Sequence, residues 1–140
     1  MSRLLEFSQH HPLLIGLVVI AILALAVDEA LRRMRKYREL AASQAVLLIN
    51  KGAAVIDLRS HAEYDAGHII NARNLPLAEL DDRTAELDKL KGQPVLLYCN
   101  SGSDAGKAAD KLVKRGLGPV DVLKGGLAAW QQQQFPVERR

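Results

Sequence analysis

An unbroken run of sixteen uncharged residues constrains this chain more than any other feature of its sequence. The run extends from Pro12 to Val27 (PLLIGLVVIAILALAV) and ends at Asp28 and Glu29. It is apolar on every face, and the rest of the chain is too small a domain to surround such a helix. As a helix the run measures about 24 Å, and residues 7–11 can extend it towards the ~30 Å hydrocarbon core of a bilayer. We therefore predict a transmembrane helix over residues 12–27.

A cleavable signal peptide is the main alternative to a membrane anchor. The tripeptide Ala24-Leu25-Ala26 has the small-x-small pattern of a cleavage site. Against cleavage, the segment before the apolar run carries Arg3, opposed by Glu6, whereas a basic cluster follows the run closely. Its members are Arg32, Arg33, Arg35, Lys36 and Arg38. Because basic residues resist translocation, they favour an anchor whose N-terminus lies outside and whose C-terminal part lies in the cytoplasm.

The anchor divides the chain into three segments. Residues 1–28 hold the membrane helix, residues 29–36 form a basic juxtamembrane linker, and residues 37–140 form a soluble domain. The whole chain has 19 basic and 16 acidic residues, and the excess lies mainly before the soluble domain. With three Tyr, two Phe and one Trp, the chain lacks the positive surface and stacking side chains of a nucleic-acid binder. We therefore expect a lipid bilayer, and no nucleic acid, among its partners.

Short apolar runs alternate with helical stretches in the soluble part. Three runs are typical of strands buried on both faces of a parallel sheet: 53–58, 94–99 and 120–123. Helices are expected around and between these runs, at 45–49, 61–66, 77–90, 104–115 and 127–134. The alternation predicts an α/β fold, in which a small parallel sheet is flanked by helices and preceded by one transmembrane helix.

Cys99 is the only cysteine, which excludes an intrachain disulfide and a multi-cysteine zinc site. It ends the most apolar predicted strand, and open parallel sheets bind ligands beyond the carboxyl ends of their strands. The small polar residues Asn100-Ser101-Gly102-Ser103 let the chain curl before a helix begins near Asp104. Backbone N–H groups of such a loop, with the positive end of the helix, form an anion cradle that favours the thiolate. We interpret Cys99 as a reactive nucleophile rather than a small buried hydrophobe.

Three groups of motifs resemble those of the rhodanese-like (sulfurtransferase) domain family, in the same order and spacing. The first group comprises Asp57-Leu58-Arg59, Glu63-Tyr64, Gly67-His68-Ile69 and Asn74-Leu75-Pro76. The second is Tyr98-Cys99-Asn100-Ser101-Gly102, which is similar to the active-site loop of the family. The third is Gly125-Gly126-Leu127-Ala128-Ala129-Trp130, followed by Phe135-Pro136-Val137. The resemblance covers residues 37–140, and the added apolar helix is similar to that of anchored single-domain bacterial members, which implies the bacterial inner membrane.

The resemblance implies that Cys99 moves sulfane sulfur from thiosulfate or a persulfide donor to a thiol or cyanide acceptor, by a ping-pong covalent mechanism. It implies that backbone N–H groups of the following loop hold the persulfide. The loop residues are Asn100, Ser101, Gly102, Ser103 and Asp104. Supporting roles fall to Asp57 and Arg59, as an ion pair that fixes the strand ends, and to His68, as a packing residue. The family needs no metal and no organic cofactor, and the anchor suggests a membrane-protein client.

The loop departs from the family pattern at the positions where the family often carries arginine. Ser103 and Asp104 stand there, so the usual cation is missing, although Lys107 one turn later can screen the carboxylate. We therefore expect weak capture of anionic thiosulfate. A second hypothesis follows, a catalytically weak module that binds a membrane-protein partner. Cysteine-phosphatase and P-loop chemistry are not supported, because Ala105 and Ala108 replace the arginine and the hydroxyl that they need.

Overall fold

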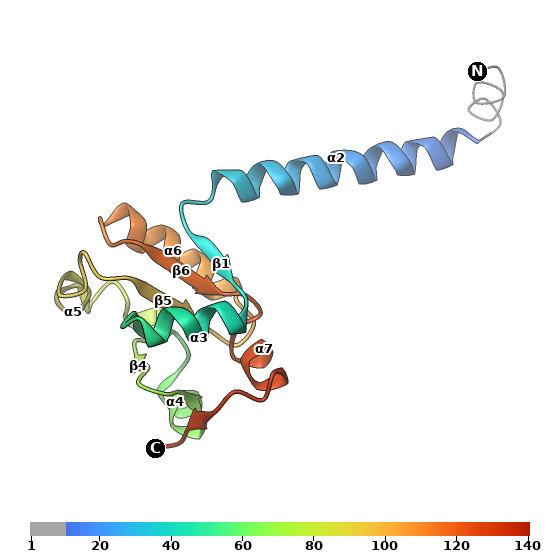
Figure 1. Cartoon of the computed structure of the whole chain (residues 1–140). Helices are drawn as coiled ribbons and strands as arrows, with labels where there is room; N and C mark the ends of the chain where they lie inside the picture. Colours follow the sequence, from blue (N-terminus) through green and yellow to red (C-terminus); the bar gives the residue numbers. More distant parts are fainter. Residues whose placement is uncertain (1–10) are drawn as a thin grey trace. The chain divides into compact units, whose positions relative to one another are not determined.

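The computed structural model describes residues 11–140, and these belong to two compact units (Figure 1). The first unit ends at Arg35, and the second comprises Lys36–Arg140. In the described part of the first unit, helix α2 extends from Pro12 to Met34 and contains 23 residues. A helix of this length rises about 34 Å, which exceeds the ~30 Å of a bilayer core. By length and composition α2 can therefore span a membrane.

The carboxyl end of α2 extends beyond the apolar run that predicts it. Helical structure continues past Val27 through two consecutive ion pairs, each between residues four apart on one face. Arg32 Nε lies 2.8 Å from a carboxylate oxygen of Asp28, and Arg33 Nε lies 2.8 Å from one of Glu29. Pairs with the acidic residue on the N-terminal side stabilise a helix by a few tenths of a kcal/mol each, about 0.2–0.5. Part of the predicted linker is thus helical.

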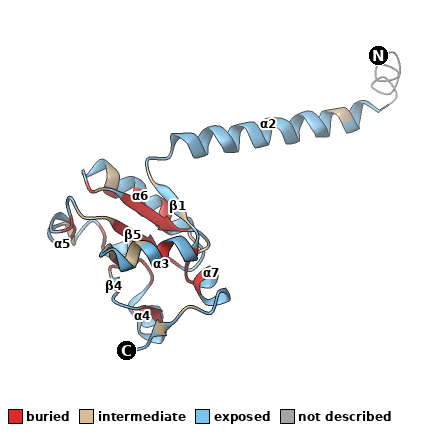
Figure 2. Ribbon diagram, in the orientation of Figure 1, coloured by how far each residue is buried: buried red, intermediate tan, exposed pale blue. Residues whose placement is uncertain are grey.

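The amino end of α2 begins at Pro12, which suits a first helical position because its missing N–H would have no partner there. His11 lies outside the helix, so the predicted extension is absent at that residue. The predicted extension over residues 7–10 lies outside the described residues. Nearly all residues of α2 are exposed (Figure 2), so the helix presents apolar surface over residues 12–27 and charged side chains beyond them.

A five-stranded parallel sheet forms the centre of the second unit, in the order β1-β6-β5-β2-β4. Its strands are β1 (Arg38–Leu40), β2 (Ala54–Asp57), β4 (Arg73–Asn74), β5 (Val95–Tyr98) and β6 (Val120–Leu123). In the central three strands, Leu97 of β5 lies opposite Ile56 of β2 and Val122 of β6. The predicted α/β fold with a parallel sheet is confirmed.

Helices connect these strands, and a smaller sheet lies apart from the main one. The helices are α3 (Ala42–Asn50), α4 (His61–Ala66), the 3₁₀ helix η1 (Leu77–Glu79), α5 (Thr84–Asp88), α6 (Ser103–Lys114) and α7 (Gly126–Gln132). The smaller sheet pairs β3 (His68–Ile69) with β7 (Val137–Glu138) in antiparallel orientation.

Alternate residues of the central strands belong to two separate hydrophobic cores. Val95 and Leu97 pack in the core that includes α6, whereas Leu96 and Tyr98 pack in the core that includes α3 and α7. Because successive strand residues point to opposite faces, helices cover the sheet on both sides. This double burial explains the unbroken apolar runs in the sequence. Cys99 continues the alternation and belongs to the core on the α6 side.

The prediction of one helix over residues 77–90 is wrong, because residues 80–83 in its middle are not helical. The chain forms the short helices η1 and α5 there, separated by a turn. In that turn Asp81 accepts hydrogen bonds from Lys111 of α6 at 3.1 Å and from Arg115, the residue that directly follows α6, at 2.9 Å. Aspartate is a poor residue for a helix interior, because its side chain favours local bonds of other geometries. The turn therefore suits an aspartate, and these exposed ion pairs join it to the α6 segment.

Candidate functional site

Cys99 lies directly after β5, the central strand, where a short loop leads to α6. Its side chain is buried, with 4% of the residue surface exposed. The N–H of Gly102 donates a hydrogen bond to Cys99 Sγ at a nitrogen–sulfur distance of 2.9 Å. Gly102 has φ of 99°, a left-handed conformation that costs glycine little, and this lets the loop curl back over the sulfur. The predicted loop therefore does bring a backbone donor to the thiol.

The first turn of α7 holds the carbonyl groups of the same loop. Leu127 N donates to the carbonyl oxygen of Cys99 at 2.9 Å, and Ala128 N donates to that of Asn100 at 3.3 Å. Gly126, the first residue of α7, has φ of 61° and lies directly against the loop. A Cβ atom at this position would lie 2.6 Å from the carbonyl carbon and oxygen of Asn100. Glycine is therefore required here for the close approach and for the positive φ.

Helix α4 reaches the loop from its other side. Asn100 Nδ2 donates to Glu63 Oε1 at 2.7 Å, while Glu63 Oε2 accepts from the backbone N of Ser60 at 3.1 Å and from its hydroxyl at 2.8 Å. The hydrogen bonds from Asn100 and then Ser60 hold the pKa of the Glu63 carboxyl below its ordinary value. The capping-box spacing Ser60-x-x-Glu63 predicts the start of a helix. It does not predict a contact with the cysteine loop, and Glu63 is absent from the predicted site.

The predicted ion pair between Asp57 and Arg59 is buried beneath the ends of β2 and β5. Arg59 Nη2 lies 2.7 Å from Asp57 Oδ2 and also donates to the carbonyl oxygen of Gly67 at 2.6 Å. Tyr98, the residue before Cys99, donates its hydroxyl to Asp57 Oδ2 at 2.7 Å. Burial raises the pKa of the Tyr98 hydroxyl, and the Asp57 charge raises it further, so Tyr98 remains a neutral donor. The network fixes the strand that carries the thiol.

His68 is a buried packing residue in the small sheet. Its Nδ1 donates to the carbonyl oxygen of Tyr64 at 2.8 Å, and its ring stacks on the Tyr64 ring with 3.8 Å between centroids. Its Nε2 lies 3.6 Å from Glu138 Oε2. These contacts join α4 to β3 and β7. The supporting role that the resemblance implies for His68 stays a prediction.

The remaining loop residues are solvent-exposed. Ser101 and Ser103 are exposed, and Asp104 lies in the first turn of α6 with about half of its side chain accessible. Lys107 Nζ lies 3.7 Å from Asp104 Oδ1, so the screening lysine is where the sequence predicts it. The N-cap residue of α6 is Gly102 rather than Asp104. Within residues 11–140, no cluster of three or more His, Cys, Asp or Glu is placed to hold a metal ion.

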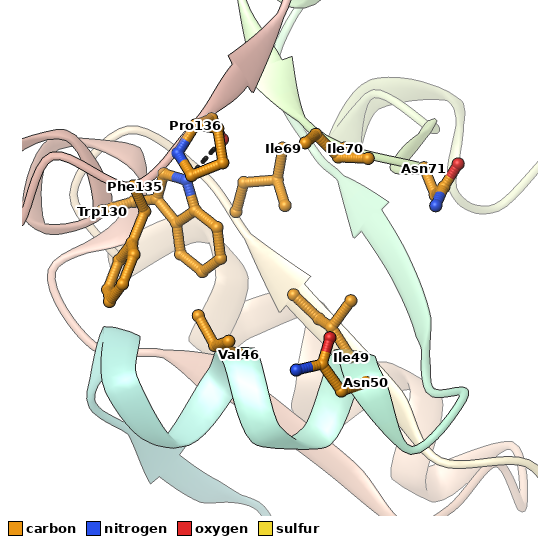
Figure 3. Close-up of a pocket in the computed structure, with 9 residues that line it drawn as sticks. All are labelled: Val46, Ile49, Asn50, Ile69, Ile70, Asn71, Trp130, Phe135 and Pro136. Carbon is orange, nitrogen blue, oxygen red and sulfur yellow. Dashed lines mark hydrogen bonds between the residues drawn. The ribbon is translucent and has the colours of Figure 1, made fainter.

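A separate apolar pocket of about 230 Å³ contains none of the predicted site residues (Figure 3). Its walls come from α3, from β3 and the residues after it, and from α7 and the segment between α7 and β7. The lining residues are Val46, Ile49, Asn50, Ile69, Ile70, Asn71, Trp130, Phe135 and Pro136. Trp130 Nε1 donates to the carbonyl oxygen of Pro136 at 3.0 Å, and this bond fixes one wall of the pocket.

Comparison with known proteins places the second unit in a large group of similar chains. A family model described as a rhodanese-like domain matches residues 41–133. The uncharacterized protein YibN of Escherichia coli K12 is 32% identical over 141 residues, which cover 99% of each chain. The thiosulfate sulfurtransferase GlpE of Pseudomonas fluorescens is 33% identical over 107 residues, covering 75% of this chain and 94% of the relative.

Solved structures show the same fold. A rhodanese-related protein from Thermoplasma volcanium superposes with a TM-score of 0.67 at 30% identity, covering 74% of this chain and 100% of that chain. A thiosulfate sulfurtransferase from Pseudomonas aeruginosa superposes with a TM-score of 0.68 at 26% identity, covering 81% of this chain and 22% of the larger enzyme.

Proposed function

Since the chain belongs to the rhodanese-like domain family, we propose that it is a membrane-anchored sulfurtransferase or persulfide carrier whose nucleophile is Cys99. The observation that carries the proposal is the hydrogen bond from Gly102 N to Cys99 Sγ at the end of the central strand. A backbone N–H aimed at sulfur stabilises negative charge there, as a thiolate and then a persulfide require.

The reaction divides into two displacements at sulfur. The Cys99 thiolate attacks the outer sulfur of thiosulfate, the bond between the two thiosulfate sulfurs breaks, and sulfite leaves with that electron pair. The enzyme then holds a Cys99 persulfide. An acceptor thiolate attacks the terminal sulfur of this persulfide, takes it as a new persulfide and releases the Cys99 thiolate. Neither step needs a redox cofactor or a metal, because each displacement exchanges one sulfur–sulfur bond for another, with no net oxidation or reduction.

Intact-mass spectrometry of the full chain in detergent tests the proposal directly. Exposure to thiosulfate should add one sulfur atom to the chain, and a low-molecular-weight thiol should then remove it. The second candidate, a weakly catalytic binding module, is favoured by the exposed Asp104 carboxylate beside the loop. A chain that accepts sulfur neither from thiosulfate nor from a neutral polysulfide would support that candidate instead.

The charge of residue 104 should limit the choice of donor. The Asp104 carboxylate repels an anionic donor. At an effective dielectric of about 20, two unit charges about 7 Å apart interact by about 2 kcal/mol. Lys107 offsets part of this repulsion. We expect Asp104→Arg to raise kcat/KM for thiosulfate about tenfold, with Asp104→Asn giving a smaller rise. Steady-state kinetics measures both. A neutral organic trisulfide should show no such rise, and an unchanged thiosulfate rate in Asp104→Arg would contradict the expectation.

We propose that α2 crosses the bacterial inner membrane and that the second unit lies in the cytoplasm. Support comes from the length of α2 and from the basic residues Arg32, Arg33, Arg35 and Lys36 at its carboxyl end. The sulfur donor, the acceptor thiol and a membrane-protein client would then meet at the inner membrane surface. External protease should leave the second unit intact in spheroplasts and digest it after lysis. A shortened, soluble periplasmic chain would instead identify a cleaved signal peptide.

A further inference from the structure

The hydrogen bond between α4 and the cysteine loop has a specific consequence for sulfur transfer. Taking the proposed function as its basis, we infer that Glu63 is a positioning residue. Through Asn100, it holds the loop in the conformation in which the Gly102 N–H reaches Cys99 Sγ. Glu63 is 37 positions before Asn100 in the chain, yet its Oε1 accepts from Asn100 Nδ2 at 2.7 Å.

The Glu63 carboxylate is itself held in place, so it can act as a fixed point for the loop. Its second oxygen accepts two hydrogen bonds from Ser60 at the start of α4. Ser60 directly follows Arg59, whose guanidinium is buried against Asp57. Glu63 is ionised at neutral pH, with a pKa below its ordinary value, and an ionised acceptor forms the stronger hydrogen bond. The two carboxylate oxygens therefore serve different partners, one within α4 and one on the loop.

Asn100 lies in the chain between Cys99, the nucleophile, and Gly102, the hydrogen-bond donor. Two hydrogen bonds hold it, one at its side chain and one at its carbonyl group. Glu63 binds its side chain, while Ala128 N donates to its carbonyl oxygen. With both groups fixed, the peptide units after Cys99 have little freedom, which sets the direction of the N–H at Gly102. Loss of the side-chain bond should loosen the loop without emptying the core, since Asn100 and Glu63 are both exposed. The expected result is slower persulfide formation in a chain that still folds.

A purely structural explanation is that Glu63 serves only the capping box with Ser60. Three variants separate this explanation from positioning. Glu63→Ala removes both the cap and the loop contact, and Asn100→Ala removes only the loop contact. Ser60→Ala weakens the cap and removes one bond to the Glu63 carboxylate, but it leaves the loop contact in place. Ser60→Ala keeps the backbone N–H that donates to Glu63 Oε2, so the carboxylate retains one of its anchors.

The test measures two quantities on the full chain in detergent. The rate of persulfide formation from thiosulfate, followed by intact mass, should fall about tenfold in Glu63→Ala and in Asn100→Ala, and no further in the double variant. Ser60→Ala removes one of the two bonds that hold the Glu63 carboxylate, so it should lower the rate by less than Asn100→Ala does, while its Tm falls like that of Glu63→Ala. Losses that multiply to about a hundredfold in the double variant, or a wild-type rate in Asn100→Ala, would overturn the inference.

Amide hydrogen exchange at Gly102 keeps the inference testable if the wild-type chain accepts no sulfur. That result would end the proposed function, but the exchange rate reports loop conformation without any donor. Exchange at Gly102 should be about tenfold faster in Glu63→Ala and Asn100→Ala than in the wild type, with a smaller increase in Ser60→Ala. Equal exchange in all four chains would show that Glu63 does not position the loop, whatever the thiol does.

Discussion

Replacing Cys99 with serine is expected to abolish sulfur transfer, lowering the rate by at least about a thousandfold. A serine hydroxyl is not ionised near neutral pH and cannot form the persulfide on which both displacements depend. Cys99 is the only cysteine, so no other thiol can take its place. Intact-mass spectrometry after thiosulfate treatment should show one added sulfur in the wild type and none in Cys99→Ser.

The Cys99→Ser chain should keep its fold, because the substituted atom is of similar size and Gly102 N can donate to a hydroxyl oxygen as it does to sulfur. Its circular dichroism spectrum and Tm should therefore match those of the wild type closely. An added sulfur atom in the serine variant would disprove the assignment of the nucleophile. A membrane partner that binds wild type and variant equally, with no sulfur added to either, would identify a docking module.

The strands that carry the site could be predicted because both of their faces are buried. β2, β5 and β6 are near-continuous apolar runs, and the core positions on both sides of the sheet explain that pattern. The short strands β1, β3, β4 and β7 contain two or three residues each, and no periodicity can be read over that length. Their pairing depends on contacts between distant parts of the chain.

Arg38 shows how one such contact changes the interpretation of a residue. By position it belongs to the basic cluster after the apolar run, which predicts membrane orientation. In the structure Arg38 lies on β1, and its Nε donates to the fully buried carboxylate of Asp121 on β6 at 2.9 Å. The hydrogen bond and charge of Asp121 raise the pKa of Arg38. A cation 83 positions away thus explains why an aspartate stands inside the apolar run of β6.

The sequence predicts the conformation of the loop after Cys99 but not the contacts of this loop with α4 and α7. The glycine and small polar residues after Cys99 predict a curled loop, and Gly102 supplies the donor. The supports from α4 and α7 come from segments about thirty residues away in either direction, where the sequence shows only a capping box and a glycine pair. Local patterns predict where a helix begins, but they do not predict which loop its first turn contacts.

Gly126 is expected to be the most sensitive position outside the nucleophile. Gly126→Ala should lower the free energy of unfolding by about 3 kcal/mol or more, through two additive causes. Its φ of 61° is strained for any residue with a side chain, at a cost of about 1–2 kcal/mol. The added Cβ would also overlap the backbone of Cys99 and Asn100, which no rotamer change can relieve because the obstructing atoms are main-chain.

Gly52→Ala is the matched control, since it separates strain from overlap. Gly52 has φ of 91° in the turn after α3, and a Cβ there would meet no atom within 4 Å. The control should therefore lose only about 1–2 kcal/mol and keep the wild-type rate of persulfide formation. In Gly126→Ala the overlap of the added Cβ with the backbone of Cys99 and Asn100 displaces the cysteine loop. Any Gly126→Ala chain that remains folded should therefore form persulfide at least about tenfold more slowly. Urea unfolding and intact-mass kinetics compare the two variants, and equal losses in both would show that α7 does not support the cysteine loop.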